Sequence, residues 1–215
     1  MTIRMIVVLF LTFYTTRIIL SVLGVDDYGV YNVVAGIVSM FSFLSTSMSN
    51  GVQRFFNYEL GKNGISGANK VFNTAIKIQV IIAIIIVVIT ESFGIWYLKH
   101  KMVIPDGRLG AAYWIFQFSI FCFVVTIMQV PFVASIMAHE KMNFYALISV
   151  IDAVLKLVIA LILPYLDSDK LIVYGLLLAL VSILDLVLYT LYARRNFQEI
   201  RFKKGFNKGR YSHPC

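Results

Sequence analysis

The chain has 215 residues, of which 60% are hydrophobic and only 14% are charged, and its mean hydropathy is +0.83. A soluble domain of this length needs far more polar surface to cover its core, so these values argue against an ordinary soluble enzyme or binding domain. The formal net charge is +8. Two cysteines, Cys122 and Cys215, provide neither a disulfide framework nor the spacing of metal ligands.

Six apolar segments are each long enough to cross the ~30 Å hydrocarbon core of a bilayer as a helix. They cover residues 5–23, 31–55, 72–98, 112–138, 144–166 and 171–193. Short polar connections separate them, among them 24–29, 61–64 and 105–107. The sequence therefore predicts an all-α polytopic bundle of six transmembrane helices over residues 1–195, followed by a basic cytoplasmic tail over residues 196–215.

The distribution of lysine and arginine predicts the orientation of this bundle, because basic residues concentrate on the cytoplasmic side. With the N-terminus inside, six crossings return the C-terminus to the same side. The cytoplasmic set is then Arg4, Arg54, Lys62, Lys70, Lys141, Arg194, Arg195, Arg201, Lys203, Lys204, Lys208 and Arg210, and the opposite set is Lys99, Lys101, Arg108 and Lys170. Both termini are therefore expected in the cytoplasm, where the tail faces anionic lipids. No base-stacking aromatic pattern accompanies the basic tail, so nucleic-acid binding is not expected.

Polar residues recur at steps of three and four inside several apolar segments, which places them on one face of each helix. These faces carry Ser39, Ser42, Thr46, Ser49 and Gln53; Ser119, Cys122, Thr126 and Gln129; Tyr145, Ser149, Asp152 and Lys156; and Ser182, Asp185, Tyr189 and Tyr192. A lipid-facing polar stripe is costly, so we expect the stripes to point inward. Two interpretations remain open: close helix packing through small hydroxyl residues, or a hydrated cavity.

Ionisable residues within the spanning segments favour a cavity, because packing alone does not require them. They are Arg17, Lys77, Glu91, Asp152, Lys156 and Asp185. Simpler explanations exist for some: Asp152 and Lys156 are four residues apart and suit a local structural ion pair, and Lys77 is near enough to the inner helix end to extend its ammonium there. No catalytic constellation or metal motif is apparent, since His139-Glu140 lacks the second histidine of a zinc hydrolase. An enzyme is therefore not expected.

Four sequence blocks resemble a known family. They are RIILSVLGVDDYGVYNVV at 17–34, QRFFNYELGK at 53–62, VPFVASIMAHEKM at 130–142 and DKLIVY at 169–174. The blocks are similar, in this order, to oligosaccharide flippases that export O-antigen and capsule, within the multidrug/oligosaccharidyl-lipid/polysaccharide exporter superfamily. The resemblance implies one six-helix lobe of a two-lobed, MATE-like transporter in a bacterial inner membrane. Such a transporter moves a polyprenyl-diphosphate-linked oligosaccharide across the membrane for surface polysaccharide biosynthesis.

The resemblance also implies a cationic cavity that holds the diphosphate. Arg17 and Arg54 match arginines of the family pattern and are the expected phosphate contacts, with Lys77 and Lys156 as weaker candidates. The polar residues expected to line the cavity are Ser42, Thr46, Ser49, Gln53, Asp152 and Asp185. No cofactor is expected, and a proton or sodium ion is the coupling ion that the family implies.

The chain ends soon after the sixth predicted helix, where the family continues into a second lobe. We therefore expect a truncated N-terminal lobe, whose activity needs a second lobe or a homodimer. Two alternatives stay open. One is an inactive or accessory membrane subunit, and the other is a drug/cation antiporter of the same superfamily.

Overall fold

The computed structural model describes residues 2–100, 108–166 and 169–200. It contains the helices α1 (Thr2–Ser39), α2 (Ser42–His100), α3 (Leu109–Ala138), α4 (Met142–Ile162) and α5 (Lys170–Asn196), and the short 3-10 helices η1 (Leu163–Tyr165) and η2 (Gln198–Ile200). Within these ranges there is no β-strand, so the predicted all-α class is confirmed. The predicted connection at 105–107 and the tail beyond residue 200 lie outside the described residues.

All five α-helices are long and apolar enough to cross a membrane. The last three predicted segments correspond to α3, to α4 with η1, and to α5. Large apolar side chains also cover much of the outer surface; on α1, for example, Phe10 is 73% and Phe13 71% exposed. Such a surface is unsuited to water and suited to lipid or a membrane partner. The chain therefore has the architecture of a multi-pass helical membrane protein.

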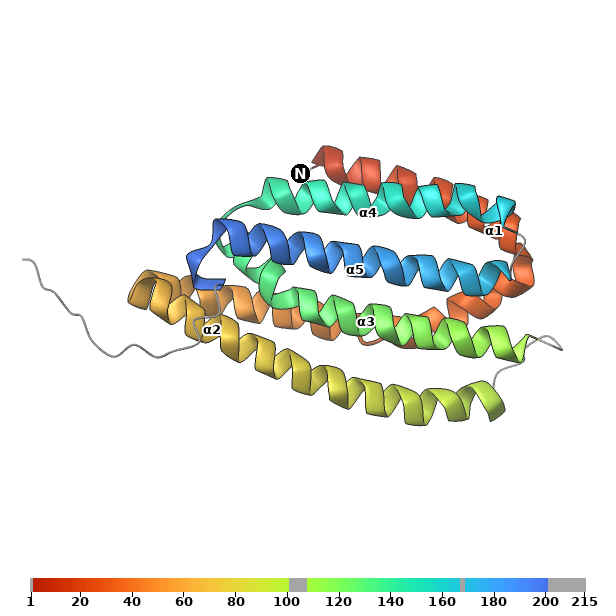
Figure 1. Ribbon diagram of the computed structural model, residues 1–215, viewed down its shortest axis with the longest axis horizontal. Coiled ribbons are helices and arrows are strands. Elements are labelled where there is room, and N and C mark those ends of the chain that lie inside the picture. The colour runs from red at the N-terminus through yellow and green to blue at the C-terminus, as the bar shows by residue number, and fades with distance from the viewer. Residues whose placement is uncertain (1, 101–107, 167–168, 201–215) are drawn as a thin grey trace, which may run out of the picture.

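The described residues contain five α-helices, so the predicted count of six was wrong. The predicted connections at 24–29 and 61–64 do not separate helices but lie within α1 and α2. Each of these elements joins two helical segments across a kink at a single glycine, Gly24 (φ 80°, ψ 172°) and Gly64 (φ 59°, ψ −149°). These backbone angles are accessible essentially only to glycine. In Figure 1 the chain turns back sharply within both elements.

The predicted helix over 31–55 is also divided, because α1 ends at Ser39 and α2 begins at Ser42. The Ser39 hydroxyl donates to the Gly36 carbonyl (2.9 Å), which also accepts from the Met40 amide (3.1 Å). A serine hydroxyl that binds a carbonyl of the preceding turn competes with regular helix hydrogen bonding. A two-residue turn at Met40 and Phe41 follows, and the amide of Leu44 then bonds to the Phe41 carbonyl (3.1 Å).

The helices form an elongated bundle in which α3 is the most buried (Figure 1). The first segment of α1 lies beside α4, while α3 lies between α5 and α2. The N-terminus, the beginning of α4 and the end of α5 lie at one end of the bundle. The kink of α1 and the beginnings of α3 and α5 lie at the other end, which Arg108 helps to join.

The apolar core consists of two clusters along the bundle. The cluster at the N-terminal end is rich in aromatic contacts: the rings of Phe144 and Tyr192 stack with centroids 3.4 Å apart, and those of His139 and Phe197 with centroids 4.0 Å apart. Phe197 and Ile200 are 5% and 1% exposed. The first residues of the predicted tail therefore pack into the bundle, because these two apolar side chains belong to its buried cluster.

Candidate functional site

A polar cavity of about 440 Å³ lies between α1, α3, α4 and α5. Hydroxyl groups make up most of its polar lining, and one ion pair lies among them. The polar lining residues are Thr12, Thr15, Thr16, Tyr28, Tyr31, Cys122, Thr126, Asp152, Lys156, Tyr174 and Ser182. The cavity has room for several water molecules and offers them many hydrogen-bond partners. Polar residues of four helices therefore converge on one space.

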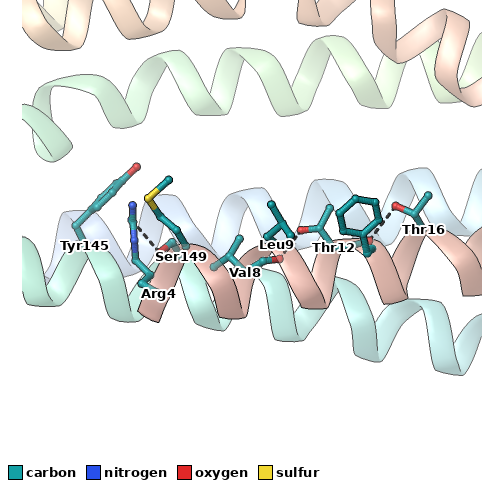
Figure 2. A pocket seen from close by; sticks show the side chains of 9 residues that line it. Arg4, Val8, Leu9, Thr12, Thr16, Tyr145 and Ser149 are labelled. Atoms are coloured by element: carbon teal, nitrogen blue, oxygen red, sulfur yellow. Dashed lines mark hydrogen bonds between the residues drawn. The ribbon is translucent and has the colours of Figure 1, made fainter. Parts of the chain in front are cut away.

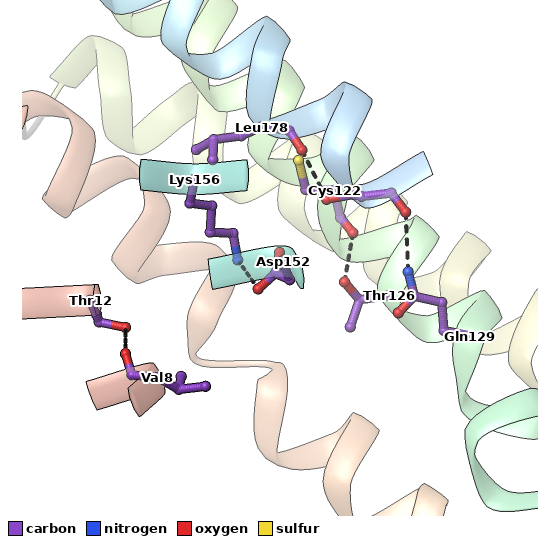
Figure 3. Close-up of polar contacts among 9 residues, drawn as sticks. Val8, Thr12, Cys122, Thr126, Gln129, Asp152, Lys156 and Leu178 are labelled. Carbon is purple, nitrogen blue, oxygen red and sulfur yellow. Dashed lines mark hydrogen bonds and ion pairs between the residues drawn. The ribbon is translucent and has the colours of Figure 1, made fainter. Parts of the chain in front are cut away.

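The ion pair in this cavity joins Asp152 and Lys156, one turn apart on α4 (Figure 3). The Lys156 Nζ atom is 2.8 Å from Asp152 Oδ2, and the two side chains are 45% and 26% exposed. The sequence spacing indicated this pair, and the structure contains it. Because both groups remain accessible from the cavity, either can contact a solute or water as well as its partner.

Asp185 on α5 places a second carboxyl group beside this pair. It is close enough to Asp152 and Lys156 to interact electrostatically with both. Its Oδ1 atom is buried and has no hydrogen-bond partner within the described part of the chain. A buried carboxylate oxygen without a donor is costly. Two carboxyl groups beside a single ammonium therefore form a group that can take up one more positive charge, such as a proton.

A second polar pocket, of about 330 Å³, adjoins the first, and Thr126 lines both. Its polar lining residues are Ser45, Thr46, Ser49, Asn50, Thr126, Gln129, Tyr145 and Tyr189. Gln129 on α3 donates its Nε2 hydrogen to the Ser182 carbonyl of α5 (3.1 Å; Figure 3). Many hydroxyls of the stripes instead bond within their own helix, as Thr126 does to the Cys122 carbonyl (2.9 Å). Such hydroxyls serve helix packing as well as the cavity lining.

The predicted site residues fall into four groups. Asp152, Lys156 and Asp185 come together, and Thr46 and Ser49 line the second pocket. Ser42 and Gln53 line neither pocket. The three other predicted cations, Arg17, Arg54 and Lys77, are exposed on α1 and α2 and line neither pocket. Of the four cations that the resemblance implied as phosphate contacts, only Lys156 lines the described cavity.

An ion-pair cluster at the opposite end of the bundle was not predicted. Arg108 contacts the Asp27 carboxylate near the kink of α1 and the Asp169 carboxylate at the beginning of α5, each at 2.9 Å. Asp169 also caps α5 by accepting from the Leu171 amide (3.1 Å). The basic-residue distribution placed Arg108 on the non-cytoplasmic side, but the sequence gave no signal for its pairing with Asp27 and Asp169, because these contacts depend on how distant segments pack.

Comparison of this chain with protein-family models, with curated proteins and with solved structures finds no match. The helices and the cavity alone define the class of the protein, which is a multi-pass, all-α membrane protein with a polar cavity inside its helix bundle.

Proposed function

We propose that this chain is one lobe of a membrane transporter and that the cavity at Asp152 and Lys156 forms part of the transport path. One observation carries the proposal: four strongly apolar helices enclose a polar space with an ion pair and an adjoining carboxyl group. Charged residues at membrane depth are costly and are typical of solute and ion pathways. Close packing of helices accounts for serines and threonines but does not require these charges.

The proposed lobe crosses the membrane six times although it has five helices. The kinks at Gly24 and Gly64 divide α1 and α2 into two segments each, and the chain turns back at both (Figure 1). The segment after Gly24 and the segment before Gly64 together make the second crossing, interrupted at Met40 and Phe41. With this path, both termini lie on the cytoplasmic side, as the distribution of basic residues favours.

A second lobe, or a second copy of the chain, is part of the proposal. Arg17 is exposed on α1, and Tyr14, one turn earlier, is 51% exposed. An arginine that faces lipid within the bilayer is costly, by about 2.5–3.5 kcal/mol on insertion scales when it lies at the helix centre. A partner that covers this face and encloses an aqueous path would remove that cost. Arg17 would then face the shared path rather than lipid.

The proposed substrate is a polyprenyl-diphosphate-linked oligosaccharide of surface polysaccharide biosynthesis, and the proposed location is a bacterial inner membrane. This substrate rests on the resemblance of the sequence to oligosaccharide flippases. Arg17, Arg54 and Lys77 are exposed and available to a phosphate group, whereas Lys156 is already paired with Asp152. The Asp152 and Asp185 carboxyl groups are the proposed binding groups for a coupling proton or sodium ion.

A drug/cation antiporter of the same superfamily is the second candidate. Two carboxyl groups, Asp152 and Asp185, accompany one ammonium group, Lys156, so the group carries one excess negative charge when all three are ionised. An acidic path suits a cationic solute better than a diphosphate. Transport of the two substrate classes distinguishes the candidates.

Proteoliposomes containing the full chain at a high protein-to-lipid ratio, so that copies can pair, provide the test. A polyprenyl-diphosphate oligosaccharide with a fluorescent label is followed by its accessibility to a membrane-impermeant quencher. We expect faster flipping than in empty vesicles, and its loss in Asp152→Asn but not in Asn143→Ala, an exposed position on the same helix. Uptake of an organic cation in place of flipping would favour the antiporter. Absence of both activities would contradict transport by this chain.

A further inference from the structure

A groove of about 600 Å³ runs along the surface between α1 and α4 (Figure 2). It adjoins the polar cavity, with which it shares Val8, Thr12 and Thr16, but neither Asp152 nor Lys156 lines it. Arg4 and Tyr145 lie at one end and Thr16 at the other. Twelve residues of α1 separate Arg4 from Thr16, which corresponds to about 18 Å along a helix. This length is close to the depth of one leaflet, half of the ~30 Å hydrocarbon core.

The floor of the groove is apolar over most of this length. Met5, Val8, Leu9 and Phe13 supply aliphatic and aromatic surface. Thr12 and Thr16 also line it, but both hydroxyls donate within α1: Thr12 to the Val8 carbonyl (2.7 Å) and Thr16 to the Thr12 carbonyl (2.9 Å). Because these donors are already used, the groove offers hydrocarbon contacts and little competing hydrogen bonding beyond Arg4.

The Arg4 guanidinium is held in place at the end of the groove. Its Nη1 atom donates to Ser149 Oγ (3.3 Å), and its Cζ atom lies 5.1 Å from the centre of the Tyr145 ring. No carboxylate lines the groove, and no ion pair of Arg4 occurs among the described residues. The remaining N–H groups of the guanidinium are therefore available to an anion, and a guanidinium fork binds phosphate well.

We propose that this groove is a binding site for an anionic phospholipid, whose phosphate binds Arg4 and whose acyl chain lies along α1 from Met5 toward Thr16. The Arg4 guanidinium complements the charge of a phosphate, and the apolar groove beside it is long enough for an acyl chain. A basic pocket between membrane helices that binds a lipid headgroup combines these two features. Arg4 lies at the end of the bundle that the distribution of basic residues assigns to the cytoplasm, so the lipid belongs to the inner leaflet. The site adjoins the proposed transport path, but Arg4, which binds the phosphate, does not line that cavity.

Native mass spectrometry of the full chain in detergent tests the proposal with two probes that have the same acyl chains, phosphatidylglycerol and phosphatidylcholine. We expect the wild-type chain to retain phosphatidylglycerol preferentially. Arg4→Gln should reduce this preference about fivefold, the effect of one basic residue near the membrane surface. The matched control is Arg195→Gln, which removes an exposed cation at the same end of the bundle and should leave the preference unchanged.

A second variant separates the groove from the charge. Leu9 is 59% exposed, so Leu9→Trp is compatible with folding while it fills the groove. It should weaken retention of phosphatidylglycerol although Arg4 is intact. Equal retention of the two lipids by the wild-type chain, equal losses in Arg4→Gln and Arg195→Gln, or unchanged retention in Leu9→Trp would each overturn the site.

Discussion

Arg108 is the residue whose substitution should destabilise the bundle most clearly. It joins the kink region of α1 to the beginning of α5 through Asp27 and Asp169, each at 2.9 Å. Arg108→Gln removes the charge and keeps most of the side-chain volume. The Asp27 side chain, only 9% exposed, would then lack the cation that compensates its burial.

The expected cost follows from how exposed each pair is. The Asp169 side chain is 35% and the Arg108 side chain 40% exposed, so this pair contributes about 0–1 kcal/mol, as surface pairs do. Breaking a fully buried pair costs about 3–5 kcal/mol. The exposure of Arg108 reduces this figure for Asp27 to about 2 kcal/mol, by solvent screening. We therefore expect a total loss of about 2–3 kcal/mol in the free energy of unfolding.

The assay is thermal unfolding of the purified protein in detergent, followed by the loss of the monodisperse peak in size-exclusion chromatography. A loss of 2–3 kcal/mol corresponds to a decrease of about 4–12 °C in the unfolding temperature of a chain of this size. Lys170→Gln is the control, because it removes a neighbouring cation for which the structure contains no carboxylate within salt-bridge distance among the described residues. A decrease in Arg108→Gln no greater than in Lys170→Gln would refute this reasoning.

A double variant distinguishes the ion pair from a general effect of charge. Asp27→Asn combined with Arg108→Gln removes the buried carboxylate together with its partner. Replacing both members of a buried pair costs much less than leaving one of them uncompensated. The double variant should therefore be more stable than Arg108→Gln alone, by at least about 1 kcal/mol of coupling. Equal stability of the two variants would show that Asp27 does not depend on Arg108.

Two further predictions concern glycines, each with a glycine control. Gly24→Ala should cost about 1–3 kcal/mol, because the backbone at φ 80° and ψ 172° is strained for alanine. Gly29→Ala in the same helix should cost nothing measurable. Both variants are compared by thermal unfolding in detergent, and equal stability would contradict the kink. Gly94→Ala should cost about 1–3 kcal/mol by overpacking, because the new methyl group would overlap the fully buried Phe116 ring. The new methyl group of Gly110→Ala would have no atom within 4 Å, so this variant is the control. The same assay checks this difference, and a neutral Gly94→Ala would mean that the ring can move aside.

The sequence predicted the last three helices well because long apolar runs define them, and their ends lie at turn residues such as His139 and Asp169. It did not predict that α1 and α2 continue through Gly24 and Gly64. Glycine marks a change of direction in a sequence, but the same residue is compatible with a loop or with a kink between two helical segments. Only the surrounding packing distinguishes these outcomes.

Prediction of the candidate site was limited in the same way, because the sequence does not show how different helices pack against one another. The ion pair of Asp152 and Lys156 follows from their spacing on one helix, so the sequence indicated it. The approach of Asp185 to this pair, and of Arg108 to Asp27, joins different helices and depends on their rotation. Arg17 illustrates the converse: an ionisable residue within an apolar segment suggests a position in a cavity, but the rotation of α1 leaves Arg17 exposed.

The central claim is that α1 and α2, each divided at a glycine, cross the membrane together with α3, α4 and α5 six times. The membrane topology of the termini tests this claim most directly. Reporter domains that are active on only one side of the membrane are fused, one per protein, to the N-terminus, to the C-terminus and at the bend beside Gly64. Six crossings predict that all three reporters lie on the cytoplasmic side. Termini on opposite sides of the membrane would mean an odd number of crossings and would contradict the proposed transporter lobe.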